Sequence, residues 1–141
     1  MGSLTQIKNI IHFPSVNSTM DEALSFVKEG LEDSFLILAD EQKTGRGRGE
    51  NTWSSPKGGF YGTYALPLEK KATEQQILFM HYAATLAVQQ VLEEETRFDI
   101  KNKWPNDIYF RNKKLGGILI EYLSGDKLFL LIGIGINLFS N

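Results

Sequence analysis

The second half of the chain alternates short apolar runs with clusters of turn-forming residues, and this pattern constrains the fold more than any other feature. Apolar runs of this length, bounded by residues such as Asn, Gly and Asp, are typical of β-strands joined by tight turns. Turns are expected at Arg111-Asn112-Lys113 and at Ser124-Gly125-Asp126. We therefore expect a largely antiparallel sheet, with strands over residues 100–103, 107–110, 114–123 and 127–138.

The first half of the chain contributes two helices. Ser18 is followed three residues later by an acid, which is a capping pattern, so a helix is expected over 19–29, ended by Gly30. A similar pattern at Thr73 predicts a second helix to about residue 95. The apolar face of this second helix is expected to consist of Ile77, Met80, Ala84, Ala87, Val88 and Val91.

Three further strands complete the predicted sheet. They are expected over residues 7–13, ending before Pro14, over 35–39, and over 59–66, ended by Pro67. The predicted fold class is therefore α+β, with a mixed, largely antiparallel sheet and the helices on one side of it.

Composition excludes several classes of protein. The formal net charge of −2 argues against a nucleic-acid-binding domain, and the chain has no cysteine for a disulfide or a thiolate-bound metal. No apolar run approaches the roughly 18–20 residues that span a bilayer, and no signal peptide is recognisable. At 141 residues the chain fits one domain. We expect a cytoplasmic protein that binds neither nucleic acid nor membrane.

The segment Gly45-Arg46-Gly47-Arg48-Gly49 predicts contact with an anion. Glycine lets backbone N–H groups approach a ligand closely, and arginine offers a planar fork of donors to carboxylate or phosphate. Trp53, four residues on, supplies an aromatic plane suited to a heterocyclic ring. The alternative interpretation of the loop alone is a flexible turn with two solvated arginines.

Three other segments also do not read as plain core or turn. Lys103-Trp104-Pro105-Asn106-Asp107 brings a lysine to a sharp strand end, where an exposed lysine is the alternative. Gly116 and Gly117 interrupt a strand, which indicates either close approach of a ligand or a β-bulge. Gly133-Ile134-Gly135-Ile136-Asn137 leaves one face of a strand bare, for a ligand or for close packing of a neighbouring segment.

Together with Ser18-Thr19, these four segments resemble, in order, the catalytic domain of the biotin–protein ligases, or holocarboxylase synthetases, over residues 10–139. The resemblance implies a class II aminoacyl-tRNA-synthetase-like fold. It also implies synthesis of biotinyl-5′-AMP from biotin and ATP, with Mg²⁺ accompanying ATP. Biotin is then transferred to a lysine of the biotin-carrier domain of a carboxylase. Some relatives dimerise through the sheet, so the resemblance allows a homodimer.

The resemblance also implies roles for individual residues, among them hydrogen bonds to the ureido ring of biotin and a stack of Trp53 on adenine. The catalytic cations would be Lys103, Arg48 and Arg46. The biotin-binding residues would be Ser18, Thr19, Gln42, Gly45, Arg46, Gly47, Arg48, Lys103, Gly116 and Gly117. The ATP-binding residues would be Arg48, Trp53, Lys103, Asn106 and Asn137. No resident metal site is expected.

The sequence departs from the family pattern in two places. Residues 49–52 lack the extra basic residues of many bacterial members, and Glu50 adds a negative charge. Members continue past the last motif into further helix and a small β-barrel, which we expect this 141-residue chain to lack, as it lacks the N-terminal DNA-binding extension of repressor members. The alternatives are a lipoate–protein ligase, a biotin-binding module without turnover, and a glycine–arginine RNA-binding element, which the net charge disfavours.

Overall fold

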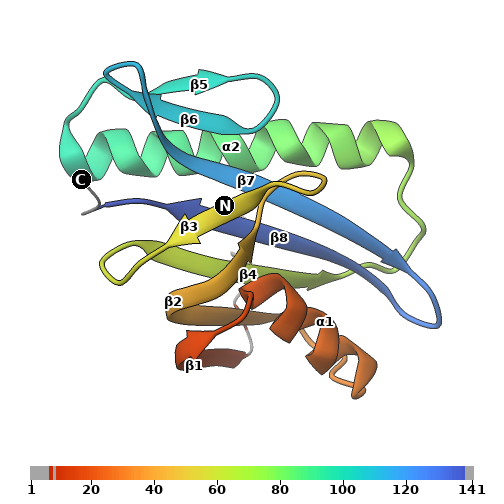
Figure 1. Cartoon of the computed structure of the whole chain (residues 1–141). Coiled ribbons are helices and arrows are strands. Elements are labelled where there is room, and N and C mark those ends of the chain that lie inside the picture. Colours follow the sequence, from red (N-terminus) through yellow and green to blue (C-terminus); the bar gives the residue numbers. More distant parts are fainter. Residues whose placement is uncertain (1–6, 8, 139–141) are drawn as a thin grey trace.

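The computed structural model describes residue 7 and residues 9–138. These residues form one mixed sheet with two helices (Figure 1). The elements in chain order are β1 (Asn9–Val16), α1 (Thr19–Lys28), β2 (Phe35–Arg46), β3 (Thr52–Ser55), β4 (Phe60–Pro67), α2 (Glu74–Thr96), β5 (Lys101–Lys103), β6 (Asp107–Phe110), β7 (Lys113–Ser124) and β8 (Leu128–Ile136).

The sheet has the strand order β1-β2-β4-β8-β7-β6-β5, and β3 pairs separately with β2. β1 and β2 run parallel, whereas the other pairs are antiparallel. The α+β class and the antiparallel second half are thus confirmed. Arg111 and Asn112, at the turn between β6 and β7, both have positive φ, as tight hairpin turns require.

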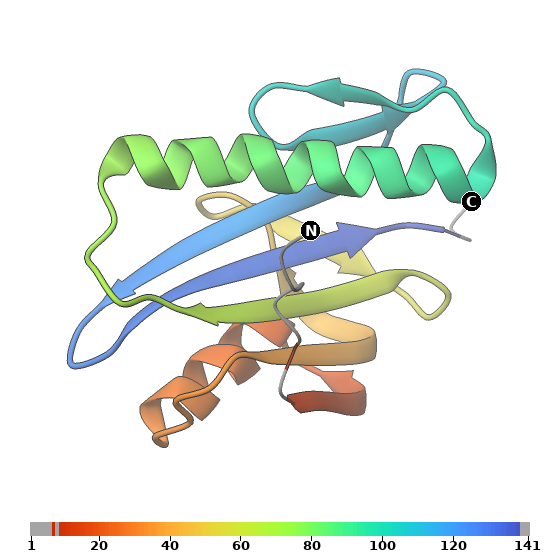
Figure 2. The same cartoon turned by 180° about the vertical axis from the view of Figure 1, so that it is seen from behind.

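The helices cover opposite faces of the sheet, so the expectation that they lie on one side is wrong. Successive side chains of a strand point to opposite faces. On β8, Leu131 belongs to the core cluster of Met20 and Ala23 from α1, whereas Ile132 packs with Ile77 and Met80 from α2. Both faces of β8 are apolar, and each helix covers one of them. α1 stands in front of the sheet in Figure 1, and α2 stands in front of it in Figure 2.

The capping patterns form as the sequence predicts. The Ser18 hydroxyl accepts hydrogen bonds from the backbone N–H groups of Met20 and Asp21. Thr73 and Gln76 form a reciprocal capping box at the start of α2.

Within the described residues, no helix combines the length and the apolar character that crossing a membrane requires.

The predicted core face of α2 is correct for four of its residues and wrong for two. Ile77, Met80, Ala84 and Val88 pack against the sheet. Ala87 and Val91 are exposed, and they border an open apolar groove between α2 and the end of β8. These two residues face the groove rather than a packed core, so helical periodicity alone placed them wrongly.

Two strands end later than predicted, and one strand was not predicted. β1 continues through Pro14, because β1 is an edge strand and tolerates a missing backbone donor. β2 continues past Ala39 to Arg46, so the loop of glycines and arginines starts inside a strand. β3 was not predicted. Its sequence, Thr-Trp-Ser-Ser, lacks apolar alternation, and its backbone pairs with the end of β2.

Candidate functional site

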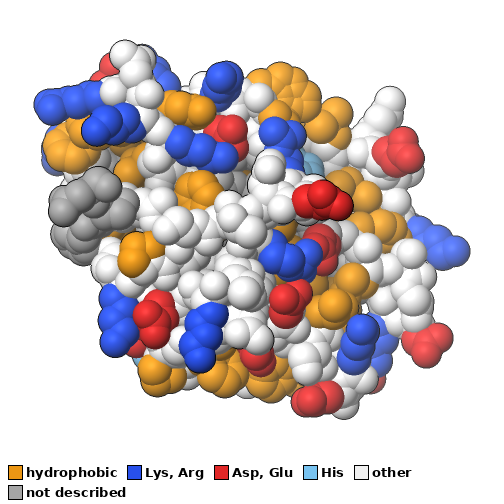
Figure 3. Space-filling view, in the orientation of Figure 1, with side chains coloured by type: hydrophobic (Ala, Val, Ile, Leu, Met, Phe, Trp, Pro, Cys, Tyr) orange, Lys and Arg blue, Asp and Glu red, His pale blue; other side chains and the backbone are white. Residues whose placement is uncertain are grey.

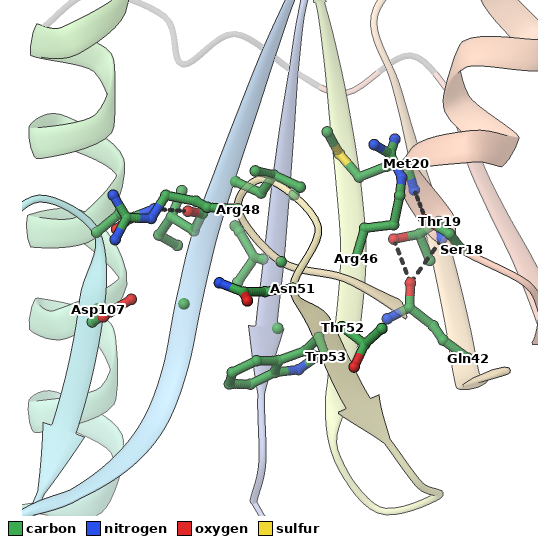
Figure 4. A pocket seen from close by; sticks show the side chains of 18 of the residues that line it. Ser18, Thr19, Met20, Gln42, Arg46, Arg48, Asn51, Thr52, Trp53 and Asp107 are labelled. Carbon is green, nitrogen blue, oxygen red and sulfur yellow. Dashed lines mark hydrogen bonds between the residues drawn. The ribbon is translucent and has the colours of Figure 1, made fainter. Parts of the chain in front are cut away.

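A cavity of about 250 Å³ opens on the face of the sheet that carries α1 (Figure 4). Its walls come from the start of α1, the β2–β3 hairpin, the loop before β6, and the middle of β7 and β8. Figure 4 shows Thr19 and Gln42 on one side of the cavity, Asp107 on the other, and Trp53 between them. The lining residues are Ser18, Thr19, Met20, Gln42, Arg46, Gly47, Arg48, Asn51, Thr52, Trp53, Asn106, Asp107, Lys114, Gly117, Ile118, Leu119, Gly133, Ile134 and Gly135.

One wall of the cavity is a chain of neutral hydrogen bonds. The Gln42 side-chain oxygen accepts from the Thr19 backbone N–H at 2.8 Å and from the Thr19 hydroxyl at 3.1 Å. The Gln42 amide nitrogen donates to the Ser55 hydroxyl at 2.8 Å. The Thr63 hydroxyl, fully buried in β4, lies 2.8 Å from the Thr19 hydroxyl. Four elements thus fix Thr19 and Gln42, which can contact an uncharged polar ligand without large rearrangement.

The arginine hairpin between β2 and β3 is closed by its own backbone. The Gly47 N–H donates to the Asn51 carbonyl at 2.8 Å, and the Asn51 N–H donates to the Arg48 carbonyl at 3.1 Å. Gly49 has φ of +62°, a left-handed conformation that glycine adopts without strain. The two arginines of this hairpin are therefore displayed on a short, ordered turn.

Arg46 is already paired with two carboxylates. Its guanidinium lies 2.6 Å from Glu121 of β7 and 3.0 Å from Asp21 of α1. The hydrogen bond to Glu121 is the main cause of a raised pKa at Arg46, which stays charged. Much of its positive charge is consequently offset before any ligand binds.

Arg48 behaves differently. It is exposed, and among the described residues no carboxylate lies within ion-pair distance of it. Burial lowers the pKa of His81 in α2, and the positive charge of Arg48 is the second cause of that shift.

Around the cavity mouth in Figure 3, Lys and Arg side chains are interspersed with Asp and Glu rather than gathered into a basic surface.

The floor of the cavity is shaped by glycines of β7 and β8. A Cβ atom on Gly133 would lie 2.8 Å from the Met20 sulfur, and one on Gly135 would lie 2.5 Å from the Trp53 indole nitrogen. Neighbouring segments, α1 and β3, therefore fill the space that these two glycines leave. In β7, a Cβ on Gly116 would lie 2.7 Å from the Gly135 carbonyl, but a Cβ on Gly117 would meet nothing closer than 3.7 Å. A side chain as small as alanine would therefore fit at Gly117 with ordinary van der Waals contacts, and Gly117 lines the cavity.

Beside Gly117 stand a cation, a carboxylate and a buried amide. The Lys114 ammonium lies 3.1 Å from the Asp107 carboxylate and 5.2 Å from the centre of the Trp53 ring. Asn106 is 2% exposed, and its side-chain nitrogen donates to the Ile118 carbonyl at 2.5 Å. Within the described part of the chain, its side-chain oxygen has no hydrogen-bond partner. A buried acceptor of this kind is costly unless a ligand or water donates to it.

A sequence model of the biotin/lipoate A/B protein ligase family matches residues 12–137. The chain belongs to this family. Among curated relatives, the biotin–[acetyl-CoA-carboxylase] ligase of Paracoccus denitrificans is 38% identical over 129 residues, which make up 86% of this chain and 51% of the relative.

Two solved ligase structures show the same fold as this family member. The biotin protein ligase of Aquifex aeolicus, in complex with biotin and ATP, matches with a TM-score of 0.78 at 37% identity, over 96% of this chain and 54% of its own. The enzyme of Leishmania major, in complex with biotinyl-5-AMP, matches with a TM-score of 0.77 at 34% identity, over 92% of this chain and 57% of its own. The chain thus spans about half the length of each relative.

Most residues that the sequence nominated for this ligase-family site line the cavity. They are Ser18, Thr19, Gln42, Arg46, Gly47, Arg48, Trp53, Asn106 and Gly117. They come from both halves of the chain, and pairing of β4 with β8 brings the two halves together. Their individual roles remain predictions.

Four nominated residues do not line the cavity. Gly45 lies beneath the hairpin, where a Cβ would stand 2.5 Å from the Trp53 carbonyl, and Gly116 packs against β8. The Asn137 side chain accepts a hydrogen bond from the Tyr61 hydroxyl at 3.3 Å. The Lys103 ammonium lies 5.7 Å from the centre of the Tyr109 ring, and Lys103 borders a separate surface hollow.

Several residues that line the cavity were not predicted from the sequence as site residues. Asp107, Lys114, Gly133 and Gly135 all lie within the recognised motifs, but their sequence positions alone gave them no role. Met20 and Asn51 lie beside motif residues and carried no chemical signal of their own.

Among the described side chains, no group of three or more His, Cys, Asp or Glu could hold a metal ion.

Proposed function

We propose that this chain is the catalytic part of an ATP-dependent biotin–protein ligase. It would join biotin and ATP to form biotinyl-5′-AMP, and would pass the biotinyl group to a lysine of a biotin-carrier domain of a carboxylase. The observation that carries this proposal is the cavity itself. A wall of neutral donors and acceptors at Thr19 and Gln42 faces a cationic end at Arg48 and Lys114. Biotin has the matching shape, a neutral ureido ring at one end and a carboxylate at the other.

The chemistry of activation fits such a cavity. A carboxylate is a poor acyl donor, and its attack on the α-phosphate of ATP joins two anions. Fixed cations lower the barrier to this step because they offset the charge that gathers in the transition state. Mg²⁺ would arrive with ATP, since this ion is commonly bound by substrate phosphates and one or two carboxylates. Asp107 is a carboxylate on the cavity wall.

The named relatives support the choice of biotin and its acceptor. The Aquifex structure holds biotin and ATP, the Leishmania structure holds biotinyl-5-AMP, and the Paracoccus relative is named for an acetyl-CoA-carboxylase acceptor. A cytoplasmic location belongs to the same proposal, because ATP and carboxylases meet there.

The proposed function is tested by measuring the transfer of labelled biotin to an isolated carrier domain by the 141-residue chain. Labelling of the carrier lysine is expected. Biotin binding without transfer would instead identify a module without turnover.

The proposal extends to a homodimer. α2 exposes several large apolar side chains, with Phe79 at 72% and Leu86 at 51% exposure. An apolar surface of this kind is a common site of association, and a second copy would remove it from water. Sedimentation velocity over a range of concentrations tests this. A dimer that Phe79→Ser weakens is expected, and a monomer at every concentration contradicts this part of the proposal.

A further inference from the structure

A second concave surface, the basic hollow, is lined by the segment after α2, by β5 and β6, and by the turn that follows β6. Its charged lining residues are Arg97, Asp99, Lys101, Lys103 and Arg111. Four of them are cations and one is an anion, whereas the whole chain has a formal net charge of −2. Away from the cavity mouth, at upper left in Figure 3, Lys and Arg side chains predominate. Positive charge is therefore concentrated on one part of a chain that is acidic overall.

Most of this positive charge is not neutralised within the chain. The Asp99 carboxylate lies 3.0 Å from the Lys101 ammonium, and both side chains are well exposed. Among the described residues, no carboxylate lies within ion-pair distance of Arg97, Lys103 or Arg111. Three cations of the basic hollow are thus available to a negatively charged partner.

Aromatic rings orient two of these cations. The Lys103 ammonium lies 5.7 Å from the centre of the Tyr109 ring, and the Arg111 guanidinium lies 5.0 Å from the centre of the Phe110 ring. Phe110 is itself stacked on Phe98, with the ring centres 4.5 Å apart. A ring face attracts a cation without removing its charge. The basic hollow therefore combines oriented cations with apolar surface, and protein–protein interfaces are enriched in arginine and aromatic residues.

The backbone of the basic hollow has an uncommon conformation at three positions. Among the described residues, Arg97, Arg111 and Asn112 are the non-glycine residues with positive φ, and all three line the hollow. Helix ends and tight hairpin turns commonly place glycine or asparagine at such positions, because a Cβ atom is strained there. Glycine would relieve the strain at the two arginines but would remove their charge. Strained residues cluster at functional sites, so the two arginines indicate a role for charge on this surface.

The basic hollow adjoins the cavity on the same face of the sheet. Lys103 of β5 is paired directly with Asp107 of β6. Residues opposite each other in antiparallel strands point to the same face, with their Cβ atoms about 4.5–5.5 Å apart. Lys103 lines the hollow and Asp107 lines the cavity, so the two surfaces meet at this pair. A protein seated in the basic hollow would stand beside the cavity.

We propose that the basic hollow is the docking surface for an acidic segment of the acceptor protein, the carrier domain whose lysine receives the biotinyl group. The acceptor has to bring one lysine to the acyl-adenylate, and a protein held beside the cavity is placed to do so. Its carboxylates would pair with Arg97, Lys103 and Arg111, and its apolar side chains would cover Phe98, which is 49% exposed. The identity of the partner rests on the proposed function, whereas its acidic character rests on the hollow alone.

Two other interpretations of the basic hollow account for less of it. Lysines on an edge strand discourage pairing with other chains, which would explain Lys101 and Lys103 of β5 but not the arginines at 97 and 111. Single-stranded nucleic acid binds to basic surfaces by stacking its bases on aromatic rings. The rings of Tyr109 and Phe110 are already in contact with cations of the hollow, and Phe110 also with Phe98.

The first test measures binding of a fluorescently labelled carrier domain by anisotropy, without biotin or ATP. The variant Arg97→Gln/Arg111→Gln removes two charges of the hollow and leaves side chains of similar length. It should bind the carrier domain roughly 3- to 10-fold more weakly, with a smaller dependence on salt, as expected for the loss of exposed charges. Wild-type protein that binds no carrier domain would overturn the proposal.

Lys43→Gln/Lys57→Gln is the matched control for this variant. It also removes two exposed positive charges, but neither lysine lines the cavity or the basic hollow. The control should bind the carrier domain as the wild type does. Equal affinities for the two double variants would show that only the total charge matters, and this would contradict the proposal.

A second test identifies the contacts chemically in the wild-type protein. A carbodiimide activates a carboxylate of the carrier domain, and a neighbouring lysine amine then displaces the urea to form an amide. Mass spectrometry should find these cross-links at Lys101 or Lys103. Cross-links confined to lysines outside the hollow, or none at all, would refute the docking site. Loss of oligonucleotide binding in Arg97→Gln/Arg111→Gln, with unchanged carrier binding, would assign the hollow to nucleic acid instead.

Kinetics separate docking from the chemistry of the cavity. In Arg97→Gln/Arg111→Gln, the KM for the carrier domain should rise roughly 3- to 10-fold. Biotin-dependent release of pyrophosphate without the carrier domain, which reports formation of the adenylate, should equal that of the wild type. A matching loss of adenylate formation would mean that the hollow only supports the cavity. Wild-type protein that binds the carrier domain through the hollow but forms no adenylate would refute the proposed function and leave the docking site intact.

Discussion

Trp53 of β3 lies directly over Gly135 of β8, where a Cβ atom would stand 2.5 Å from the indole nitrogen. The glycine therefore sets the position of the aromatic wall of the cavity. Gly135→Ala should push the indole out of place and lower the free energy of unfolding by about 1–3 kcal/mol, the usual cost of overpacking. The fluorescence of Trp53, measured in a Trp104→Phe background, should change with it.

Gly125→Ala is the control for this substitution. Gly125 lies in the turn between β7 and β8, and a Cβ there would meet no atom within 4 Å. Its stability and fluorescence should match the parent protein. Unaltered fluorescence in Gly135→Ala would show that Trp53 does not depend on this glycine.

The glycine pair of β7 should respond to alanine in opposite ways. Gly116→Ala would place a methyl group 2.7 Å from the Gly135 carbonyl, and should destabilise the protein by roughly 1–3 kcal/mol. Gly117→Ala makes ordinary contacts, so the melting temperature should stay close to that of the wild type. Its methyl group would occupy the cavity floor and weaken ligand binding. Stability curves and calorimetry check both, and a destabilised Gly117→Ala with normal binding would contradict this division.

Thr63 should influence ligand binding without lining the cavity. Its buried hydroxyl lies 2.8 Å from that of Thr19, which bonds Gln42. Thr63→Val keeps the shape but removes this bond, and should cost about 1–2 kcal/mol of stability and weaken biotin binding several-fold. Thr44→Val is the control, because it loses a more exposed hydroxyl bond to the Asn17 carbonyl. Equal biotin affinity in both variants would argue against a role for the Thr63–Thr19 bond.

His81 should make stability depend on pH. Burial, and then the charge of Arg48, lower its pKa below the ordinary 6.5. As pH falls through about 6.5 the unfolded chain binds a proton there that the folded protein does not, so stability is lost until the folded pKa is reached. His81→Gln should flatten this part of the stability curve, measured by denaturant unfolding from pH 7 to 5.

The contribution of Arg48 can be isolated by NMR titration of His81. Arg48→Gln should move the pKa of His81 upward, toward its ordinary value. Arg111→Gln, at the β6–β7 turn, removes the same charge elsewhere and should not. An unchanged His81 pKa in Arg48→Gln would mean that the Arg48 side chain does not reach toward α2.

Local signals in the sequence predicted local structure well. The caps at Ser18 and Thr73 depend on a few neighbouring residues, and both formed as expected. The second-half strands were also predicted, because each apolar run is bounded by turn residues. The placing of α1 and α2 on opposite faces could not be predicted in this way, since it depends on which alternate side chains of β8 each helix covers.

The composition of the site was predictable only in part. Motif resemblance nominated Arg48, Trp53 and Gly117, which line the cavity. It gave no role to Lys114, whose position depends on an irregularity in the β6–β7 pairing between Ile108 and Tyr109. No pattern in the sequence predicts a shift in strand register of this kind. A register shift of one residue moves a side chain to the other face of the sheet.

The central claim is that this cavity activates biotin. The most direct measurement incubates the 141-residue chain with α-³²P-labelled ATP and Mg²⁺, with biotin in one reaction and lipoate in another, and separates the nucleotides formed. The account predicts labelled biotinyl-5′-AMP in the first reaction and no acyl-adenylate in the second. An adenylate formed with lipoate and not with biotin would contradict it.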